Sequence, residues 1–151
     1  MSYVGILEPT PSGSALGLID QFDDPQSAID WGDGFGAAMA VADFDHDGDD
    51  ELVVGAPGVN VGAPGHVYVY RSAAGTGMEL WGSRAMPAAT CTDTTICWFG
   101  NAVGVGYFHT KTPPLGDFDM VVGAPYANRV FYYQADGNGT IPSYIESYGP
   151  H

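Results

Sequence analysis

An internal repeat restricts the possible folds of this chain more than any other feature. Residues 35–42 (FGAAMAVA) are echoed 64 positions later by residues 99–106 (FGNAVGVG). Residues 52–57 (LVVGAP) are echoed 68 positions later by residues 120–125 (MVVGAP), so the second copy contains a loop that is longer by four residues. Two copies of one supersecondary unit predict a repeat architecture, in which neighbouring units bury one another.

Each copy contains four candidate strands. Two surround the Phe-Gly to Gly-Ala-Pro stretch, and two belong to an aromatic, β-branched hairpin that begins at residues 66–70 or 129–133. Short apolar runs bounded by turn residues are typical of strands, and no helical period persists beyond one turn, for which residues 28–31 are a candidate. Four-stranded units of this length are typical of β-propeller blades, so we predict an all-β fold.

The N-terminal segment matches only half of a unit. Residues 3–7 and 15–19 resemble the hairpin that follows each Gly-Ala-Pro. We therefore predict an outer hairpin of an incomplete blade in residues 1–30, a repeat in 31–95 and a second, degenerate repeat in 96–151. Propellers close with about four to eight blades, whereas this chain supplies roughly two and a half. It belongs to a longer chain, closes a ring with other copies, or forms a filament.

An acidic loop, residues 43–51 (DFDHDGDDE), connects the two inner strands of the first copy. Carboxylates at positions 1, 3 and 5, followed by glycine at position 6, supply the oxygen ligands and the sharp turn that a hard cation needs. Position 7 offers a backbone carbonyl and position 9 a carboxylate. Such a set selects Ca²⁺ over zinc or copper. The predicted ligands are Asp43, Asp45, Asp47, Asp49 and Glu51, and the alternative is a solvated acidic turn.

This loop is not that of an EF-hand. An EF-hand requires a bidentate Glu at position 12 and a helix on either side. Position 12 here is Val54, inside a strand-like run, and the residues before the loop are also strand-like. The predicted calcium loop therefore connects two strands.

The corresponding loop of the second copy lacks the acidic pattern. Tyr107 occupies its first position, and residues 108–116 contain no alternating carboxylates. Asp117 and Asp119 are too few for a tight Ca²⁺ site, so we predict that this copy is metal-free. His109 shows no partner pattern in the sequence. The longer, Pro-rich loop is either a recognition surface or a tolerated insertion.

Taken together, these motifs are similar to those of a known repeat. Phe35-Gly36, the acidic loop and Gly55-Ala56-Pro57 resemble the FG-GAP repeat of integrin α-subunit propellers, and the second copy looks like a degenerate version of it. The resemblance covers about residues 31–134. It implies propeller blades and a structural Ca²⁺ ion held by the acidic loop. It also implies a non-enzymatic role in extracellular protein interaction, adhesion or assembly.

Charge narrows the possible partners. The chain has 18 Asp and Glu residues against four Lys and Arg, a net charge of −14 at pH 7. Nucleic acids and anionic membranes require clustered basic residues, so we exclude both as partners. No apolar run approaches the roughly 20 residues of a membrane helix. We predict protein partners, either other copies or the rest of a longer chain.

A pair of cysteines favours an extracellular or cell-surface location, and a glycosylation-type triplet adds little to it. Cys91 and Cys97 flank a short polar loop, and we predict a disulfide between them, with two free thiols as the alternative. The triplet beginning at Asn138 has the form of an N-glycosylation acceptor. No nucleophile elbow, phosphate loop or HExxH is present, so we predict that the chain is not an enzyme. Two alternatives are a self-assembling subunit of a surface filament or layer and an accessory domain of a secreted hydrolase or lyase.

Overall fold

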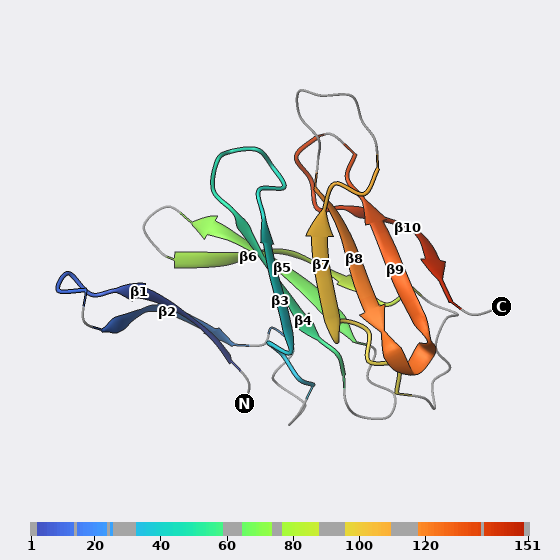
Figure 1. Ribbon diagram of the computed structural model, residues 1–151, viewed down its shortest axis with the longest axis horizontal. Coiled ribbons are helices and arrows are strands. Elements are labelled where there is room, and N and C mark those ends of the chain that lie inside the picture. Colours follow the sequence, from blue (N-terminus) through green and yellow to red (C-terminus); the bar gives the residue numbers. More distant parts are fainter. Residues whose placement is uncertain are drawn as a thin grey trace.

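The computed structural model describes residues 3–13, 15–23, 25, 33–58, 65–73, 77–87, 96–109, 118–136 and 138–149. Within these residues it contains ten β-strands and one short 3-10 helix (Figure 1). The elements are β1 (Tyr3–Pro9), β2 (Leu16–Asp23), β3 (Ala38–Ala42), β4 (Glu51–Ala56), β5 (His66–Ala73), β6 (Gly77–Ala85), β7 (Ala102–Gly106), β8 (Asp119–Ala124), η1 (Pro125–Ala127), β9 (Arg129–Gln134) and β10 (Ser143–Tyr148). The described part of the chain has no helix that is long and apolar enough to cross a membrane.

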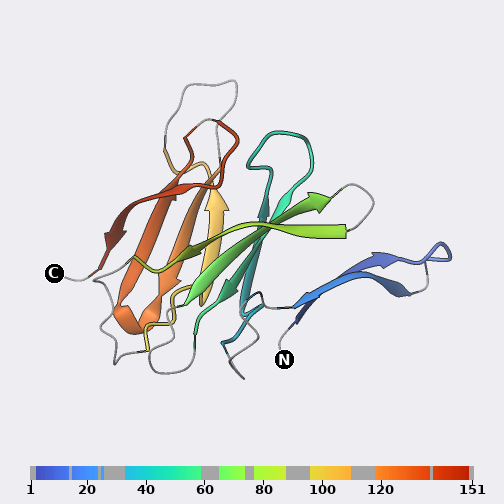
Figure 2. The same ribbon diagram turned by 180° about the vertical axis from the view of Figure 1, so that it is seen from behind.

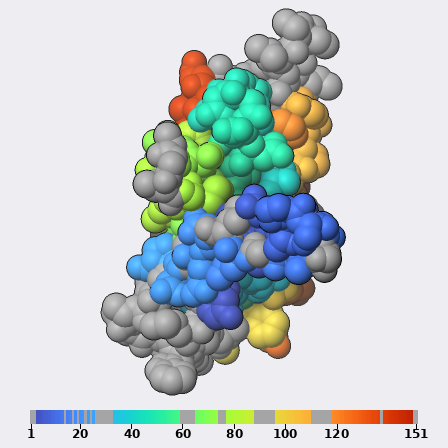
Figure 3. All heavy atoms as spheres, turned by 90° about the vertical axis from the view of Figure 1, so that its left-hand side faces the viewer, coloured from blue at the N-terminus to red at the C-terminus, as the bar shows by residue number. Residues whose placement is uncertain are grey.

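The strands form three antiparallel sheets. β1 and β2 make a separate hairpin, and the two four-stranded sheets have the orders β3-β4-β5-β6 and β7-β8-β9-β10. The inner strands β3 and β7 lie next to each other, and the hairpin lies on the far side of the first sheet (Figures 1 and 2). Seen from the hairpin side, β1 and β2 lie at the surface in front of that sheet (Figure 3). The predicted all-β fold, two propeller-type blades and an extra hairpin, is confirmed.

The first two strands of each four-stranded sheet pair in an equivalent register. Ala42, the last residue of β3, pairs with Glu51, the first residue of β4. In the second sheet, Gly106 at the end of β7 pairs with Asp119 at the start of β8. The acidic loop and its longer counterpart therefore leave the same corner of their sheets, and their residues can be compared position by position.

The main core lies between the two four-stranded sheets. Phe99 is fully buried there, with its ring edge-on to Phe131 at a centroid distance of 5.2 Å. Since side chains alternate across a strand, every second residue of the central strands points into this core. Its other buried members are Ala42, Phe44, Val53, Val67, Val69, Met120, Val122, Ala124, Tyr133 and Ile141. A second core joins Val4 of the hairpin to the opposite face of the first sheet, through Phe35, Val54, Ala56, Tyr68 and Tyr70.

Glycine at two positions allows the second sheet to approach the first. A Cβ atom on Gly55 would lie 2.0 Å from the carbonyl oxygen of Gly100, and one on Gly65 would lie 1.9 Å from that of Phe99. Real Cβ atoms do not come so close to backbone atoms, so any side chain at either position would force the sheets apart. The Phe-Gly corner of one copy thus fits against the Gly-Ala-Pro strand of the copy before it.

The described residues contain one short helical element. It is the 3-10 turn η1, directly after the second Gly-Ala. The candidate helical turn at residues 28–31 lies outside the described residues. Pro125 opens η1 with a favourable φ, and Asn128 closes it in the left-handed region at φ 52° and ψ 40°. The turn directs the chain from β8 into β9.

Candidate metal centre

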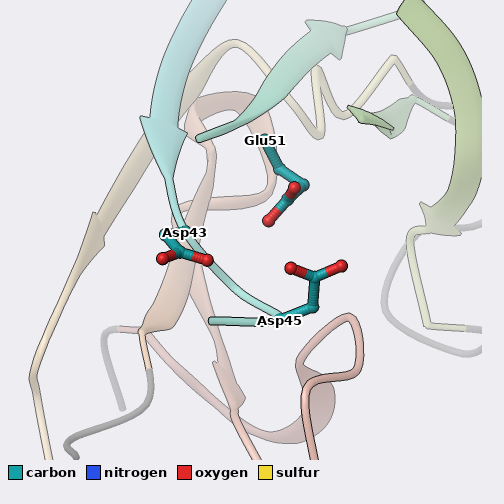
Figure 4. A group of neighbouring side chains, drawn as sticks. All are labelled: Asp43, Asp45 and Glu51. Atoms are coloured by element: carbon teal, nitrogen blue, oxygen red, sulfur yellow. The ribbon is translucent and has the colours of Figure 1, made fainter. Parts of the chain in front are cut away.

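The acidic loop leaves the edge of the first sheet between β3 and β4. Three of its carboxylates converge at this corner, from Asp43 and Asp45 in the loop and Glu51 at the start of β4 (Figure 4). One oxygen from each lies within 4.8 Å of the other two. Asp47 and Asp49 are exposed and lie outside this group. The structure thus brings together three of the four carboxylates predicted as ligands, whereas Asp49 was predicted to contribute its backbone carbonyl.

Backbone amide groups of the loop donate to its own carboxylates. Gly48 N donates to Asp43 Oδ2 at 3.2 Å, and Asp47 N donates to Asp45 Oδ1 at 3.2 Å. The next residue pair repeats the pattern, because Asp49 N donates to Asp47 Oδ1 at 2.9 Å. These hydrogen bonds shape the loop as a series of Asx turns. Gly48 has a φ of 98°, which confirms that the sharp turn needs glycine.

Glu51 is the unusual member of the group. Its carboxylate is 1% exposed and accepts a 2.8 Å hydrogen bond from Phe44 N. The pKa of Glu51 is raised from 4.5 to about 7, mainly by burial; the hydrogen bond from Phe44 N opposes the rise, and repulsion from Asp45, Asp47 and Asp43 adds to it. A buried carboxylate among other carboxylates is destabilising unless a proton or a cation neutralises it.

A second buried atom points to the same requirement. Asp43 Oδ1 is buried and accepts no hydrogen bond from the residues that the structure describes, although the other oxygen of this side chain accepts one. Buried carboxylate oxygens without a partner are rare, because their desolvation is not compensated. The orphaned oxygen, the buried Glu51 and an all-oxygen donor set together fit a hard divalent cation at this corner.

The second sheet also has a buried carboxylate at this corner, but an imidazole and not other carboxylates faces it. Asp119 takes the position of Glu51, and His109 takes the position of Asp45. His109 Nδ1 lies 2.6 Å from Asp119 Oδ2, so an imidazole faces the buried carboxylate where the first copy has other carboxylates. The backbone contact is shared, because Phe108 N donates to Asp119 at 3.1 Å as Phe44 N donates to Glu51.

Asp119 is fully buried and richly hydrogen-bonded. Besides Phe108 N and the His109 ring, it accepts from His109 N at 3.1 Å, from Tyr132 Oη at 3.0 Å and from Ala135 N at 3.0 Å. Burial alone would raise the pKa of Asp119, but the hydrogen bonds, led by that from His109, hold it below its usual value of 3.8. The ionised carboxylate is therefore stabilised by protein donors.

Sequence reasoning missed this cluster. His109 showed no partner pattern, because the residue that it contacts is ten positions away, beyond a loop of different length. The signal that could have found it is the alignment of the two loops, which places His109 on Asp45. Asp117 and most of the Pro-rich loop, residues 110–117, lie outside the described residues. So does Cys91, whose pairing with the buried Cys97 stays a prediction.

Comparisons with known proteins agree with these observations. The family model described as FG-GAP repeat matches residues 35–70, from the Phe-Gly corner through the acidic loop to β5. The phosphatidylinositol-glycan-specific phospholipase D of Mus musculus is 34% identical over 98 residues, which are 62% of this chain and 10% of the mouse protein. The chain thus spans about a tenth of the length of that relative. Residues 35–70 are an FG-GAP repeat, and the two four-stranded sheets of this chain are β-propeller blades.

Proposed function

We propose that this chain is a non-enzymatic, calcium-binding FG-GAP module that serves protein interaction, adhesion or assembly outside the cell. The buried Glu51 beside Asp43 and Asp45 carries the proposal, because three carboxylates converge at this corner and one of them is removed from water. The FG-GAP match over the same loop supports Ca²⁺ as the ion. The ion would neutralise the buried carboxylates and fix the corner of the blade.

The loop provides enough oxygen atoms for Ca²⁺. Asp43, Asp45 and Glu51 would supply carboxylate ligands, and the orphaned Oδ1 of Asp43 gains a partner. Asp47 and the backbone carbonyl of Asp49 would complete the shell after a small movement of the exposed part of the loop. Flexible coordination by six to eight oxygens is what Ca²⁺ accepts.

Calcium titration tests the proposal. The parent chain should bind one Ca²⁺ in calorimetry, and Glu51→Gln should weaken binding by roughly 100-fold or more, because it removes a ligand charge. Asp50→Asn is the matched control, since Asp50 is exposed in the same loop and outside the carboxylate group; its affinity should change less than about threefold. No heat of binding by the parent chain would exclude a calcium site.

Open apolar surface supports a role in protein interaction. The outward face of the second sheet has a hollow of about 400 Å³ that includes Val121, Val130 and Ile145. In the repeat, Val121 and Val130 correspond to Val53 and Val67, which are fully buried against the next sheet. Val130 is instead 45% exposed. A face with the same apolar pattern as a packed face is suited to another blade, and we propose a second copy as its partner.

Sedimentation velocity measures this association. We expect the parent chain to associate increasingly as its concentration rises, and more strongly in added salt, which screens the net charge of −14. Val130→Glu should shift the chain toward monomer by roughly tenfold in dissociation constant. Ser72→Glu adds the same charge at an exposed strand position of the first sheet and should have little effect. A parent chain that stays monomeric at all concentrations would contradict self-association.

A second candidate is an accessory module of a secreted hydrolase. The mouse relative, a phospholipase D by name, favours it, and the matched segment is 10% of that protein. In that role the chain would supply binding or stability, and a separate part of a longer protein would supply catalysis. Lipid hydrolysis by the purified chain alone would refute the non-enzymatic proposal.

A further inference from the structure

The acidic loop of the first repeat is in contact with a turn of the second repeat. The described residues of this turn, between β9 and β10, are Asp136 and 138–140. If a Cβ atom is placed on Gly139, it lies 3.1 Å from both Cα and the carbonyl oxygen of Asp45, and 3.3 Å from Asp45 Cβ. The backbone of the second repeat therefore lies directly against the backbone of a residue that carries one of the three converging carboxylates.

The turn has a defined shape of its own. Asp136 Oδ1 accepts hydrogen bonds from Asn138 N and from Thr140 Oγ1, each at 3.0 Å. Gly139 has a φ of 63°, in the left-handed region that favours glycine. The conformation therefore favours glycine, and a side chain here would also push against Asp45, which would have to move by a few tenths of an ångström.

Phe44 provides a second contact between the acidic loop and the second repeat. Phe44, between Asp43 and Asp45, is buried in the core shared by the two sheets. Its ring meets the Phe118 ring of the second repeat edge-on, at a centroid distance of 6.5 Å and an interplanar angle of 81°. The loop is thus fixed by the second repeat at two consecutive residues, through a side chain at Phe44 and through backbone at Asp45.

From these contacts we infer that the calcium site belongs to both repeats, and that Gly139 is a positioning residue for it. The inference rests on the proposed calcium function and adds to it a dependence on the second repeat. Ca²⁺ affinity depends on how well the carboxylates are held in place before the ion arrives, and residues behind the ligands typically change affinity by about 10- to 100-fold. A side chain at Gly139 would displace Asp45 and weaken binding without touching the ion.

Gly139→Ala tests the inference against a closely matched control. Gly13→Ala imposes an alanine at nearly the same φ, 66°, in the hairpin turn, where no atom lies within 4 Å of the added Cβ. Both variants carry the strain of a left-handed alanine, and only Gly139→Ala pushes against the loop. In Ca²⁺ titrations of the full chain, we expect Gly139→Ala to lose about tenfold or more in affinity and Gly13→Ala less than twofold.

Melting temperatures in EDTA and in Ca²⁺ provide a readout that general destabilisation does not mimic. If Gly139 positions the site, the difference between the two temperatures shrinks in Gly139→Ala and is unchanged in Gly13→Ala. Should Gly139→Ala fail to fold, Thr140→Val removes one hydrogen bond of the turn without changing its charge, and a several-fold loss of affinity is then expected.

The outcomes separate the two proposals. A parent chain that does not bind Ca²⁺ overturns the calcium function, and the positioning role with it. A parent chain that binds Ca²⁺, together with a folded Gly139→Ala or Thr140→Val variant of unchanged affinity, overturns the positioning role alone.

Discussion

Calcium is expected to raise the melting temperature of this chain by roughly 5–10 °C over its value in EDTA at pH 7.5. An ion that binds only the native state at about 100 times its dissociation constant contributes about 2.7 kcal/mol, and each kcal/mol shifts the melting temperature of a domain of this size by about 2–4 °C. The Glu51 carboxylate makes the effect large, since it is buried among other carboxylates when no cation is present.

The calcium effect should depend steeply on pH. Burial raises the pKa of Glu51 to about 7 in the metal-free fold, whereas the unfolded chain titrates near 4.5. Between these values the native chain keeps a proton that the unfolded chain has lost, so this group makes the metal-free fold less stable as pH rises. Calcium needs the ionised carboxylate, so its affinity rises over the same range. The melting difference between Ca²⁺ and EDTA should therefore be small at pH 5 and largest above pH 7.

Glu51→Gln provides the sharpest control for this result. The amide keeps an acceptor for Phe44 N and removes the buried charge. In EDTA at pH 8 this variant should therefore melt at a higher temperature than the parent chain, although it has lost a ligand. It should not respond to Ca²⁺. Differential scanning calorimetry at several pH values measures both quantities, and a parent melting temperature that is the same in Ca²⁺ and EDTA above pH 7 would exclude the proposed role of Glu51.

Some features of the fold were predictable from the sequence. The four strands of each blade followed from the repeat, because the Phe-Gly and Gly-Ala-Pro motifs recur at nearly constant spacing. The converging carboxylates of Asp43, Asp45 and Glu51 followed from a short loop, whose local spacing determines which side chains can meet. These features depend on contacts within one repeat or on the repetition itself.

Contacts that depend on longer loops were not predictable. His109 reaches Asp119 across a loop of different length. The alignment of the two loops places His109 on Asp45, but that alignment alone does not say that the imidazole meets the carboxylate. Gly139 meets Asp45 only because the two blades pack side by side, so its role depends on tertiary structure. Asp47 is the predicted carboxylate ligand that does not join the group, and the cause is local: the exposed Asp47 side chain accepts a hydrogen bond from Asp49 N.

Replacement of Asp119 by alanine should lower the stability of the chain by roughly 3–5 kcal/mol. The buried carboxylate accepts hydrogen bonds from three backbone amides, the His109 ring and the Tyr132 hydroxyl, and all five donors would lose their acceptor, four of them at partly buried positions and Ala135 N at a buried one. The milder variants His109→Ala and Tyr132→Phe remove one side-chain donor each and should cost about 1–2 kcal/mol. Urea unfolding in EDTA measures these values.

The pH dependence of Asp119 has the opposite sign from that of Glu51. Since its pKa is lowered in the fold, Asp119 contributes stability that is fully present above its usual value of 3.8 and is lost as the pH falls through the native pKa. Asp119→Asn should therefore differ most from the parent chain near neutral pH and least in acid. Asp136→Ala is the matched exposed control, because Asp136 also accepts a backbone and a side-chain hydrogen bond, and its stability loss should be much smaller.

The Asp119 variants also test whether the loop of the second repeat takes part in calcium binding. If protein hydrogen-bond donors take the place of the cation in the second repeat, Asp119→Asn should lower the melting temperature equally in Ca²⁺ and in EDTA. The difference between these two melting temperatures should then be the same as in the parent chain. An Asp119 variant that lost the calcium response, while still folded, would instead mean that the second loop shares in ion binding. The two equivalent corners would then be one coupled site, and the His109–Asp119 pair could not be a substitute for the metal.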